Sequence, residues 1–187
     1  MEAVKRQIHY TYDDYVKWDT SERYELIEGT AYMMSAPSIA HQSISLELSR
    51  QFGNFLRGKP CRVFAAPFDV RLNYDSGDDT CVQPDITIVC DHAKLSDGKS
   101  CNGAPDMIVE IISPSTASLD WFKKTRLYQK AGVGEYWIVD PEIKAVFVNI
   151  LEDGQYQPRE YTVSDSASLP VRALPGFRVQ LDELFTP

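Results

Sequence analysis

Residues 106–140 read DMIVEIISPSTASLDWFKKTRLYQKAGVGEYWIVD, and this stretch decides the fold. It opens with an apolar run over residues 107–112 that only Glu110 interrupts, which is typical of a strand buried on both faces. The spacing of apolar residues predicts an amphipathic helix over residues 119–131 and a second strand over residues 135–140. Strand, helix and strand in so short a stretch predict a crossover unit on a mixed or parallel sheet.

Glu110 is a carboxylate in a strand that is expected to be buried. Taking an ionised carboxylate out of water is costly unless it is paired, protonated or bound to a cation. A salt bridge to Lys123, Lys124 or Arg126 on the following helix is one interpretation. A functional site is the other, and a second acid upstream favours it.

The composition bounds the class of protein. The 187 residues predict one domain over residues 1–187, with 43% hydrophobic and 25% charged residues. No apolar run approaches the roughly 20 residues of a membrane helix, and the first residues lack a secretory apolar core, so we expect a cytoplasmic protein without membrane contact. The net charge of −8 argues against tight, sequence-independent DNA binding by the monomer, although a cleft can still have a basic lining.

The four cysteines, Cys61, Cys81, Cys90 and Cys101, show no C-x-x-C spacing and no clustered histidines. This pattern argues against a zinc site. Free thiols are the simplest interpretation, and the even number of cysteines leaves disulfides open.

The rest of the chain predicts short strands and two further helices besides the central unit. The principal helix should begin at Ser38 and end near Arg57. The other expected elements are a short helix over 11–18, a hairpin of 24–27 with 31–34, strands over 62–66, 68–72 and 81–90, loops over 73–80 and 91–105, a hairpin of 145–151 with 155–163, short edge strands within 169–179, and a helical turn over 181–185.

The predicted chemistry depends on bringing Asp85 and Glu110 together. Neighbouring strands lie about 5 Å apart, and two carboxylates at that separation call for a proton or a cation between them. Mg²⁺ is usually bound by few carboxylates and keeps several of its waters. Lys124 could add an ammonium beside the ion, and the spacing of Asp120, Lys124 and Tyr128 at i, i+4 and i+8 predicts one helix face.

An ordered set of motifs resembles a known family. The pieces are YELIEG (24–29), PSIAH (37–41), VQPD (82–85), APDMIVEIISPST (104–116), Asp120 with Lys124, and LYQKAGVGEYWIVDP (127–141). Together they resemble the PD-(D/E)XK nuclease superfamily and, within it, the Uma-two type of restriction endonuclease that is common in cyanobacteria. The resemblance spans nearly the whole chain.

The resemblance implies an α/β (α+β mixed) fold with a restriction-endonuclease-like core, in which helices flank a mixed β-sheet. It implies Asp85 and Glu110 as Mg²⁺ ligands, with the backbone carbonyl of Ile111 as a third. The sequence departs from the superfamily pattern at Ile112, where a lysine belongs. In the Uma-two type the matching lysine is Lys124, on the following helix. This placement is physically reasonable, since a long side chain can deliver its ammonium from a neighbouring helix.

Four secondary candidates follow the family pattern, and each has a structural alternative. His41 could face the site or lie at the surface, and Glu25 could be a third carboxylate or a salt-bridge partner. Tyr128 could be a core residue, and Asp120 could be a charge favoured by the helix dipole.

The sequence therefore predicts a Mg²⁺-dependent endonuclease, with Mn²⁺ able to substitute, that hydrolyses nucleic acid and above all DNA by direct attack of water. The alternative is a binding or assembly module that keeps the fold while its catalysis is weak or lost. Glycoside hydrolysis by a carboxylate pair is a more distant alternative. The superfamily also favours a homodimer, and the acidic charge leaves room for an unidentified protein partner.

Overall fold

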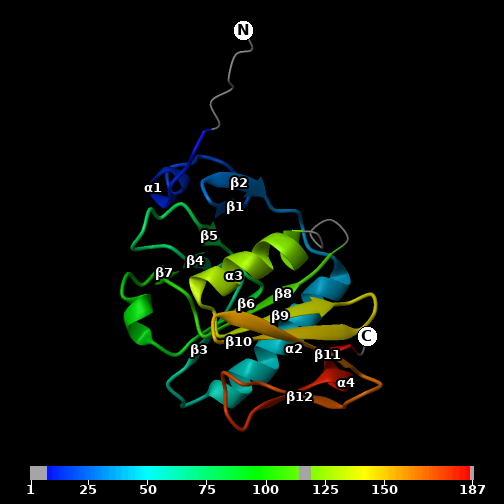
Figure 1. Ribbon diagram of the computed structural model, residues 1–187. Coiled ribbons are helices and arrows are strands. Elements are labelled where there is room, and N and C mark those ends of the chain that lie inside the picture. The colour runs from blue at the N-terminus through cyan, green and yellow to red at the C-terminus, as the bar shows by residue number, and fades with distance from the viewer. Residues whose placement is uncertain (1–7, 114–118, 186–187) are drawn as a thin grey trace.

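The computed structural model describes residues 8–113 and 119–185, except the side chains of Leu119 and Asp120. Its centre is a six-stranded sheet in the order β11-β10-β9-β8-β6-β3 (Figure 1). The strands are β3 (Arg62–Ala65), β6 (Ile86–Val89), β8 (Met107–Ile111), β9 (Glu135–Asp140), β10 (Ala145–Glu152) and β11 (Gln155–Thr162). β8 and β9 are parallel, whereas the other neighbouring strands of this sheet are antiparallel. The predicted mixed sheet with a crossover connection is confirmed.

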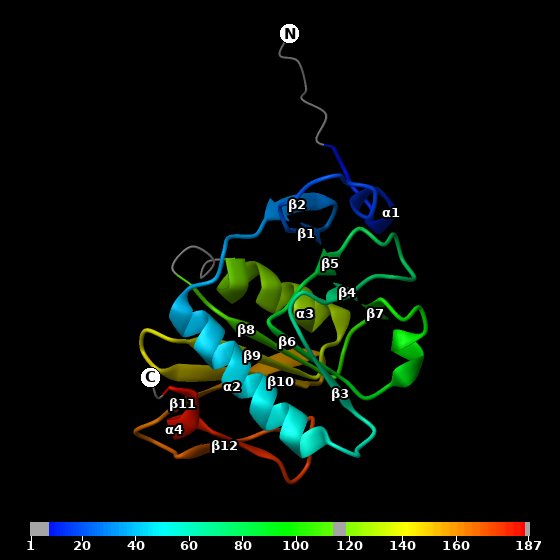
Figure 2. The same ribbon diagram turned by 180° about the vertical axis from the view of Figure 1, so that it is seen from behind.

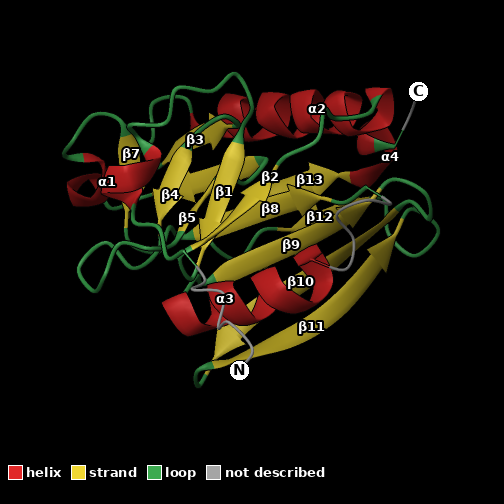
Figure 3. Ribbon diagram, turned by 90° about the horizontal axis from the view of Figure 1, so that it is seen from above, coloured by secondary structure: helices red, strands yellow, loops and turns green. Residues whose placement is uncertain are grey.

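Helices cover the two faces of this sheet. α2 (Ile39–Leu56) crosses one face (Figure 2), and α3 (Thr125–Ala131) covers the other, so the strands lie between the two helices when the molecule is viewed from above (Figure 3). The alternation of side chains along β8 builds both layers: Val109 packs in the core beneath α2, and Ile108 packs in the core beneath α3. One strand thereby serves two cores.

A smaller sheet in the order β2-β1-β5-β4-β7 packs on the α3 side. Its strands are β1 (Tyr24–Ile27), β2 (Thr30–Met33), β4 (Asp69–Arg71), β5 (Cys81–Val82) and β7 (Ser100–Asn102). The remaining elements are α1 (Tyr12–Tyr15), the 3₁₀ helix η1 (His92–Leu95), the π-helical segment η2 (Leu119–Lys124), β12 (Ser168–Pro170), β13 (Arg178–Gln180) and α4 (Leu181–Leu184). The C-terminal elements pack with α2 in its core.

Local sequence signals account for the boundaries of these elements. The Ser38 side chain accepts a hydrogen bond from the backbone N–H of His41 at 3.2 Å, and so caps α2. Glu28 and Gly29 both have positive φ angles, as Asp153 and Gly154 do, which suits the two-residue turns of the β1–β2 and β10–β11 hairpins. Both hairpins and the start of α2 agree with the sequence-based prediction.

The strand predicted over residues 81–90 is wrong in one respect, because the structure divides it. β5 pairs with β1 and β4 in the small sheet, and β6 pairs with β3 and β8 in the large sheet. Pro84 lies between them and has no N–H to donate to a ladder. The chain therefore passes from one sheet to the other at residues 83–85, and this passage leaves Gln83 and Asp85 beside a pocket.

Three further expectations need correction. The helix predicted over 119–131 begins with the π-helical turn η2 before α3, and the predicted loop 91–105 contains η1 and β7. Cys61 and Cys90 form a disulfide, since they face each other just beyond the β3–β6 pair, whereas Cys81 and Cys101 are free and buried.

No helix within residues 8–113 and 119–185 is long and apolar enough to cross a membrane.

Candidate active site

A pocket of about 320 Å³ opens where the large sheet, the small sheet and the beginning of α2 meet. Six of the predicted site residues line it: Glu25, His41, Asp85, Glu110, Ile111 and Lys124. They come from β1, α2, the segment before β6, β8 and η2. The tertiary structure therefore gathers residues that are up to 99 positions apart in the chain.

Asp85 and Glu110 meet through the register of β6 and β8. Ile86 pairs with Val109 in this antiparallel ladder, so the next pair along places Asp85 opposite Glu110. The backbone N–H of Ile111 donates to Asp85 Oδ2 at 2.7 Å, which fixes the carboxylate against the end of β8. Both acids line the same pocket, as the sequence predicts.

His41 contacts Asp85 from the first turn of α2. Its Nε2 lies 3.1 Å from Asp85 Oδ2, and the Ser38 cap holds the backbone on which it stands. The other ring nitrogen, Nδ1, is buried and has no hydrogen-bond partner among the described residues. His41 therefore faces the site rather than the surface.

Glu110 lies at the centre of a buried cluster of charges. Lys124 Nζ is 2.9 Å from Glu110 Oε1, and it is 3.0 Å and 2.9 Å from Glu25 Oε1 and Oε2. Tyr128 OH donates to Glu110 Oε1 at 2.6 Å. All four side chains are almost completely buried, and burial raises the pKa of Tyr128 well above its usual value, so this hydroxyl remains a donor at neutral pH.

The cluster distinguishes the two adjacent lysines. Lys124 points into the site, whereas Lys123 bonds the hydroxyl of Tyr32 and lies 4.3 Å from its ring centroid. Lys124 and Tyr128 both bond Glu110, which confirms that the two share one helix face. The side chain of Asp120, predicted for the same face, lies outside the described residues.

Glu110 forms the salt bridge to the following helix that the structural interpretation predicts. This salt bridge alone does not explain why further carboxylates line the same pocket. Glu25 and Glu110 place two carboxylates on one ammonium, and Asp85 adds a third carboxylate to the pocket lining. A buried excess of negative charge is costly unless a further cation or proton offsets it. Arg23 and Lys124 are the two cationic side chains of the lining, so they leave one of the three carboxylates uncompensated, and a proton or a cation could offset it.

The donor set fits Mg²⁺. Two carboxylates and a backbone carbonyl are oxygen ligands of the kind that Mg²⁺ binds, and neither free cysteine lines the pocket. Within the described parts of the chain, no group of three or more His, Cys, Asp or Glu side chains is arranged to hold a metal. Mg²⁺ bound here would have few protein ligands and would keep several of its waters.

Gln83 was not singled out from the sequence, although it lies within the VQPD motif. Its backbone N–H donates to Glu25 Oε1 at 2.8 Å. Its side-chain amide donates to Asp69 Oδ1 at 2.8 Å and Tyr15 OH at 3.2 Å, while its Oε1 accepts two hydrogen bonds from Arg23. The position two residues before Asp85 was the signal that could have identified it.

Comparisons with known proteins agree with this architecture. Residues 12–182 match the model of the Uma2 family, described as "putative restriction endonuclease". An uncharacterized protein of Synechocystis sp. is 30% identical over 165 residues, which cover 84% of this chain and 83% of that protein. A crystal structure from Anabaena variabilis, described as a putative nuclease belonging to DUF820, superposes with a TM-score of 0.76 at 21% identity, covering 94% of this chain and 97% of the other.

Proposed function

Because this chain belongs to the Uma2 family of restriction-endonuclease-like proteins, we propose that it is a Mg²⁺-dependent endonuclease that hydrolyses the phosphodiester bonds of nucleic acid, with DNA as its substrate. The family and the shared fold support nuclease function. One observation carries the finer proposal: Asp85 and Glu110 line one pocket, and Lys124 is bonded to Glu110.

Asp85, Glu110 and the backbone carbonyl of Ile111 are the groups that would hold Mg²⁺, or Mn²⁺ in its place. When bound, such an ion supplies Lewis acidity and lowers the pKa of a bound water.

The protein's own side chains have separate roles around those acids. The Ile111 N–H and His41 Nε2 orient the Asp85 carboxylate. Lys124 and Tyr128 hold Glu110 through the same oxygen, and Glu25 holds the ammonium of Lys124. A fixed ammonium in a buried site stabilises the negative charge that develops on the phosphate oxygens during attack by water.

The test is cleavage of a supercoiled plasmid in the presence of Mg²⁺ or Mn²⁺ and in the presence of a chelator. We expect Asp85→Asn and Glu110→Gln each to reduce cleavage by more than about 100-fold, since even the outer partners of metal ligands are worth about 10–100-fold. Glu160→Gln is the matched control, because Glu160 is an exposed acid on β11 with no ion pair among the described residues. Equal cleavage by wild type and both site variants would identify a contaminant and refute the proposal.

The net charge of −8 favours a second candidate, a binding or assembly module whose catalysis is weak or lost. This candidate predicts that the wild type binds nucleic acid or a protein partner but cleaves no plasmid with either metal. The same experiment therefore separates the two functions.

Homodimer formation, a cytoplasmic location, a separate protein partner and a single domain over residues 1–187 remain predictions. Two copies would let two active sites address the two strands of a duplex. Sedimentation equilibrium of the purified protein measures the oligomeric state directly.

A further inference from the structure

Arg23 places a guanidinium at the pocket, although the sequence analysis did not identify this residue as a site candidate. The residue directly precedes β1, is exposed, and lines the same pocket as Asp85 and Glu110. Its backbone carbonyl accepts a hydrogen bond from the N–H of Met34 at 2.8 Å, which anchors it at the base of the β1–β2 hairpin. The hairpin therefore delivers a positive charge to the rim of the pocket.

The charge of Arg23 differs from the other charges around it. Lys124, the other strong cation of the pocket lining, is offset by Glu25 and Glu110. The salt-bridged arginines of the described chain, Arg50, Arg71 and Arg172, each contact a carboxylate. Arg23 forms no ion pair within residues 8–113 and 119–185, and its side chain instead donates to the neutral amide of Gln83.

Gln83 holds this guanidinium in a defined orientation. Its Oε1 accepts from Arg23 Nε at 3.0 Å and from Nη2 at 2.6 Å. The amide cannot turn freely, because its NH₂ group is bonded to Asp69 and Tyr15 and the residue is 8% exposed. Since a neutral acceptor leaves the charge uncompensated, Arg23 is ordered without being neutralised. That combination suits recognition of an anion.

The position of Gln83 relates Arg23 to the proposed reaction. Gln83 lies two residues before Asp85, a span of about 7 Å in extended chain. One strand of a DNA duplex carries a phosphate about every 3.4 Å of helix axis. An anion bound by Arg23 while the scissile phosphate lies at Asp85 would therefore be within a few nucleotides of that phosphate.

We propose that Arg23 binds a phosphate of the nucleic-acid backbone that flanks the scissile phosphate, and that Gln83 pre-positions the guanidinium for this contact. The inference rests on the proposed nuclease function. A guanidinium offers parallel N–H donors that match phosphate oxygens. In a protein of net charge −8, an unpaired cation at the pocket also offsets the repulsion that approaching phosphates meet.

Binding and cleavage of a short fluorescein-labelled DNA duplex test this inference. Binding is measured by fluorescence anisotropy with a chelator present, at salt concentrations between about 50 and 200 mM. Over this range the loss of one phosphate contact reduces the magnitude of the slope of log K against log salt by about 0.9. Cleavage is measured with Mg²⁺. We expect Arg23→Ala to lower the salt slope by about that amount and to raise KM with little change in kcat, because flanking contacts contribute uniform binding.

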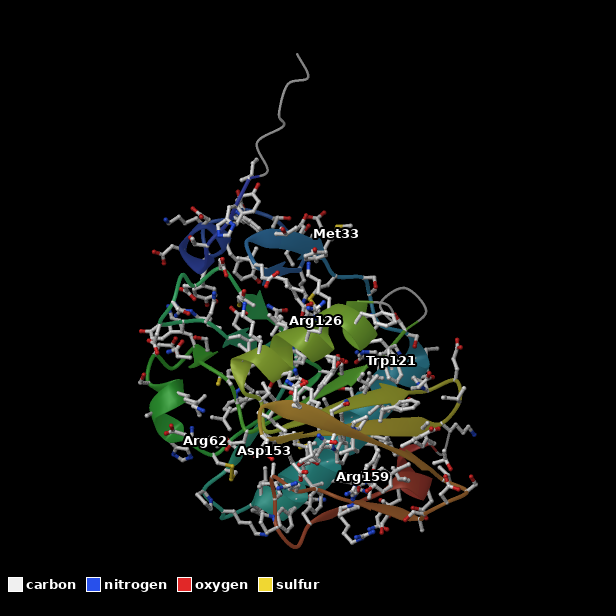
Figure 4. The ribbon with its side chains drawn as sticks, viewed as in Figure 1. Met33, Arg62, Trp121, Arg126, Asp153 and Arg159 are labelled. Atoms are coloured by element: carbon white, nitrogen blue, oxygen red, sulfur yellow. A yellow bond between two sulfur atoms is a disulfide. The ribbon has the colours of Figure 1, made fainter. Side chains whose placement is uncertain are left out.

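Arg23→Lys keeps the charge and loses the fork geometry, so we expect the wild-type salt slope with weaker binding. Arg159→Ala is the matched control: Arg159 is exposed on β11, far from pocket residue Met33 (Figure 4), and should bind and cleave as the wild type does. Thermal melting of each variant checks that it is folded.

The outcomes separate this inference from the function on which it rests. A wild type that cleaves while Arg23→Ala keeps the wild-type salt slope and KM overturns the role of Arg23 and leaves the nuclease proposal intact. An equal loss in Arg159→Ala overturns it as well. A wild type that neither binds nor cleaves the duplex refutes the nuclease proposal and the inference with it.

Discussion

At the scale of one residue, the contacts of the buried Glu110 carboxylate both stabilise the fold and fix this side chain in the pocket. Its Oε1 accepts from an ammonium and from a phenol hydroxyl, so that the charge is compensated within the protein. Removing one partner of such a group is costly, because the remaining charge stays buried. The same contacts fix the carboxylate in the pocket, and the structural and functional interpretations of Glu110 therefore share one geometry.

Tyr128→Phe tests this compensation. Hydrogen bonds to charged groups are worth about 1.5–3 kcal/mol, so we expect the free energy of unfolding to fall by that amount. Tyr156→Phe is the matched control, because the hydroxyl of this half-buried residue donates to the neutral carbonyl of Val133 at 3.0 Å, and a loss of about 1 kcal/mol is expected. Urea unfolding at neutral pH measures both. Equal losses would show that Glu110 is not ionised or that Tyr128 does not bond it.

At the scale of elements, the site depends on two features: the break between β5 and β6, and the crossover from β8 through η2 and α3 to β9. The break places residues 83–85 between the segments that pair in the two sheets. The crossover returns the chain over the sheet so that Lys124 and Tyr128 lie above Glu110. A stable end to α3 supports this placement, and Gly132 provides it with a left-handed conformation at φ 87°.

Gly132→Ala and Gly53→Ala form a matched pair that tests the helix end. A Cβ at either position meets no atom within 4 Å, so packing plays no part in the difference. At Gly132 the left-handed backbone should cost about 1–2 kcal/mol of stability. In the interior of α2 at Gly53, alanine should stabilise by about 0.5–1 kcal/mol. Chemical unfolding that shows the same sign for both variants would contradict the assigned conformation of Gly132.

At the scale of the whole molecule, Glu135 connects the central sheet to the C-terminal segment. The carboxylate is 1% exposed and accepts from Trp137 Nε1 at 2.8 Å and from the backbone N–H of Ala173 at 2.7 Å. Burial raises the pKa of this carboxyl above its ordinary value of 4.5, although these hydrogen bonds act in the opposite direction. The folded protein therefore binds this proton more tightly than the unfolded chain does.

This difference makes a contribution to stability that depends on pH. The contribution is fully present below the unfolded pKa near 4.5, and it is lost as the pH rises through the raised folded pKa. We expect Glu135→Gln to remove the part of the free energy of unfolding that decreases as the pH rises. Because the variant also loses one hydrogen-bond acceptor, its free energy of unfolding should be lower than that of the wild type at every pH. Urea unfolding as a function of pH, with Glu160→Gln as the exposed control, measures the difference. A wild-type and Glu135→Gln pair with parallel pH profiles would contradict the raised pKa.

The sequence by itself determined the crossover unit, both hairpins, the cap of α2 and the identities of Asp85 and Glu110 as site candidates. These features depend on local signals: apolar periodicity, turn residues, a capping serine and carboxylates within apolar strands. The family resemblance was confirmed across residues 12–182.

Only the tertiary structure decided how the pocket is completed. The split of residues 81–90 between two sheets, the choice of Lys124 over Lys123, the contact of His41 with Asp85 and the hold of Gln83 on Arg23 all depend on elements distant in sequence. Strand register and helix placement are set by which faces pack together, and side-chain pairs that span 44 to 99 positions follow from that packing alone.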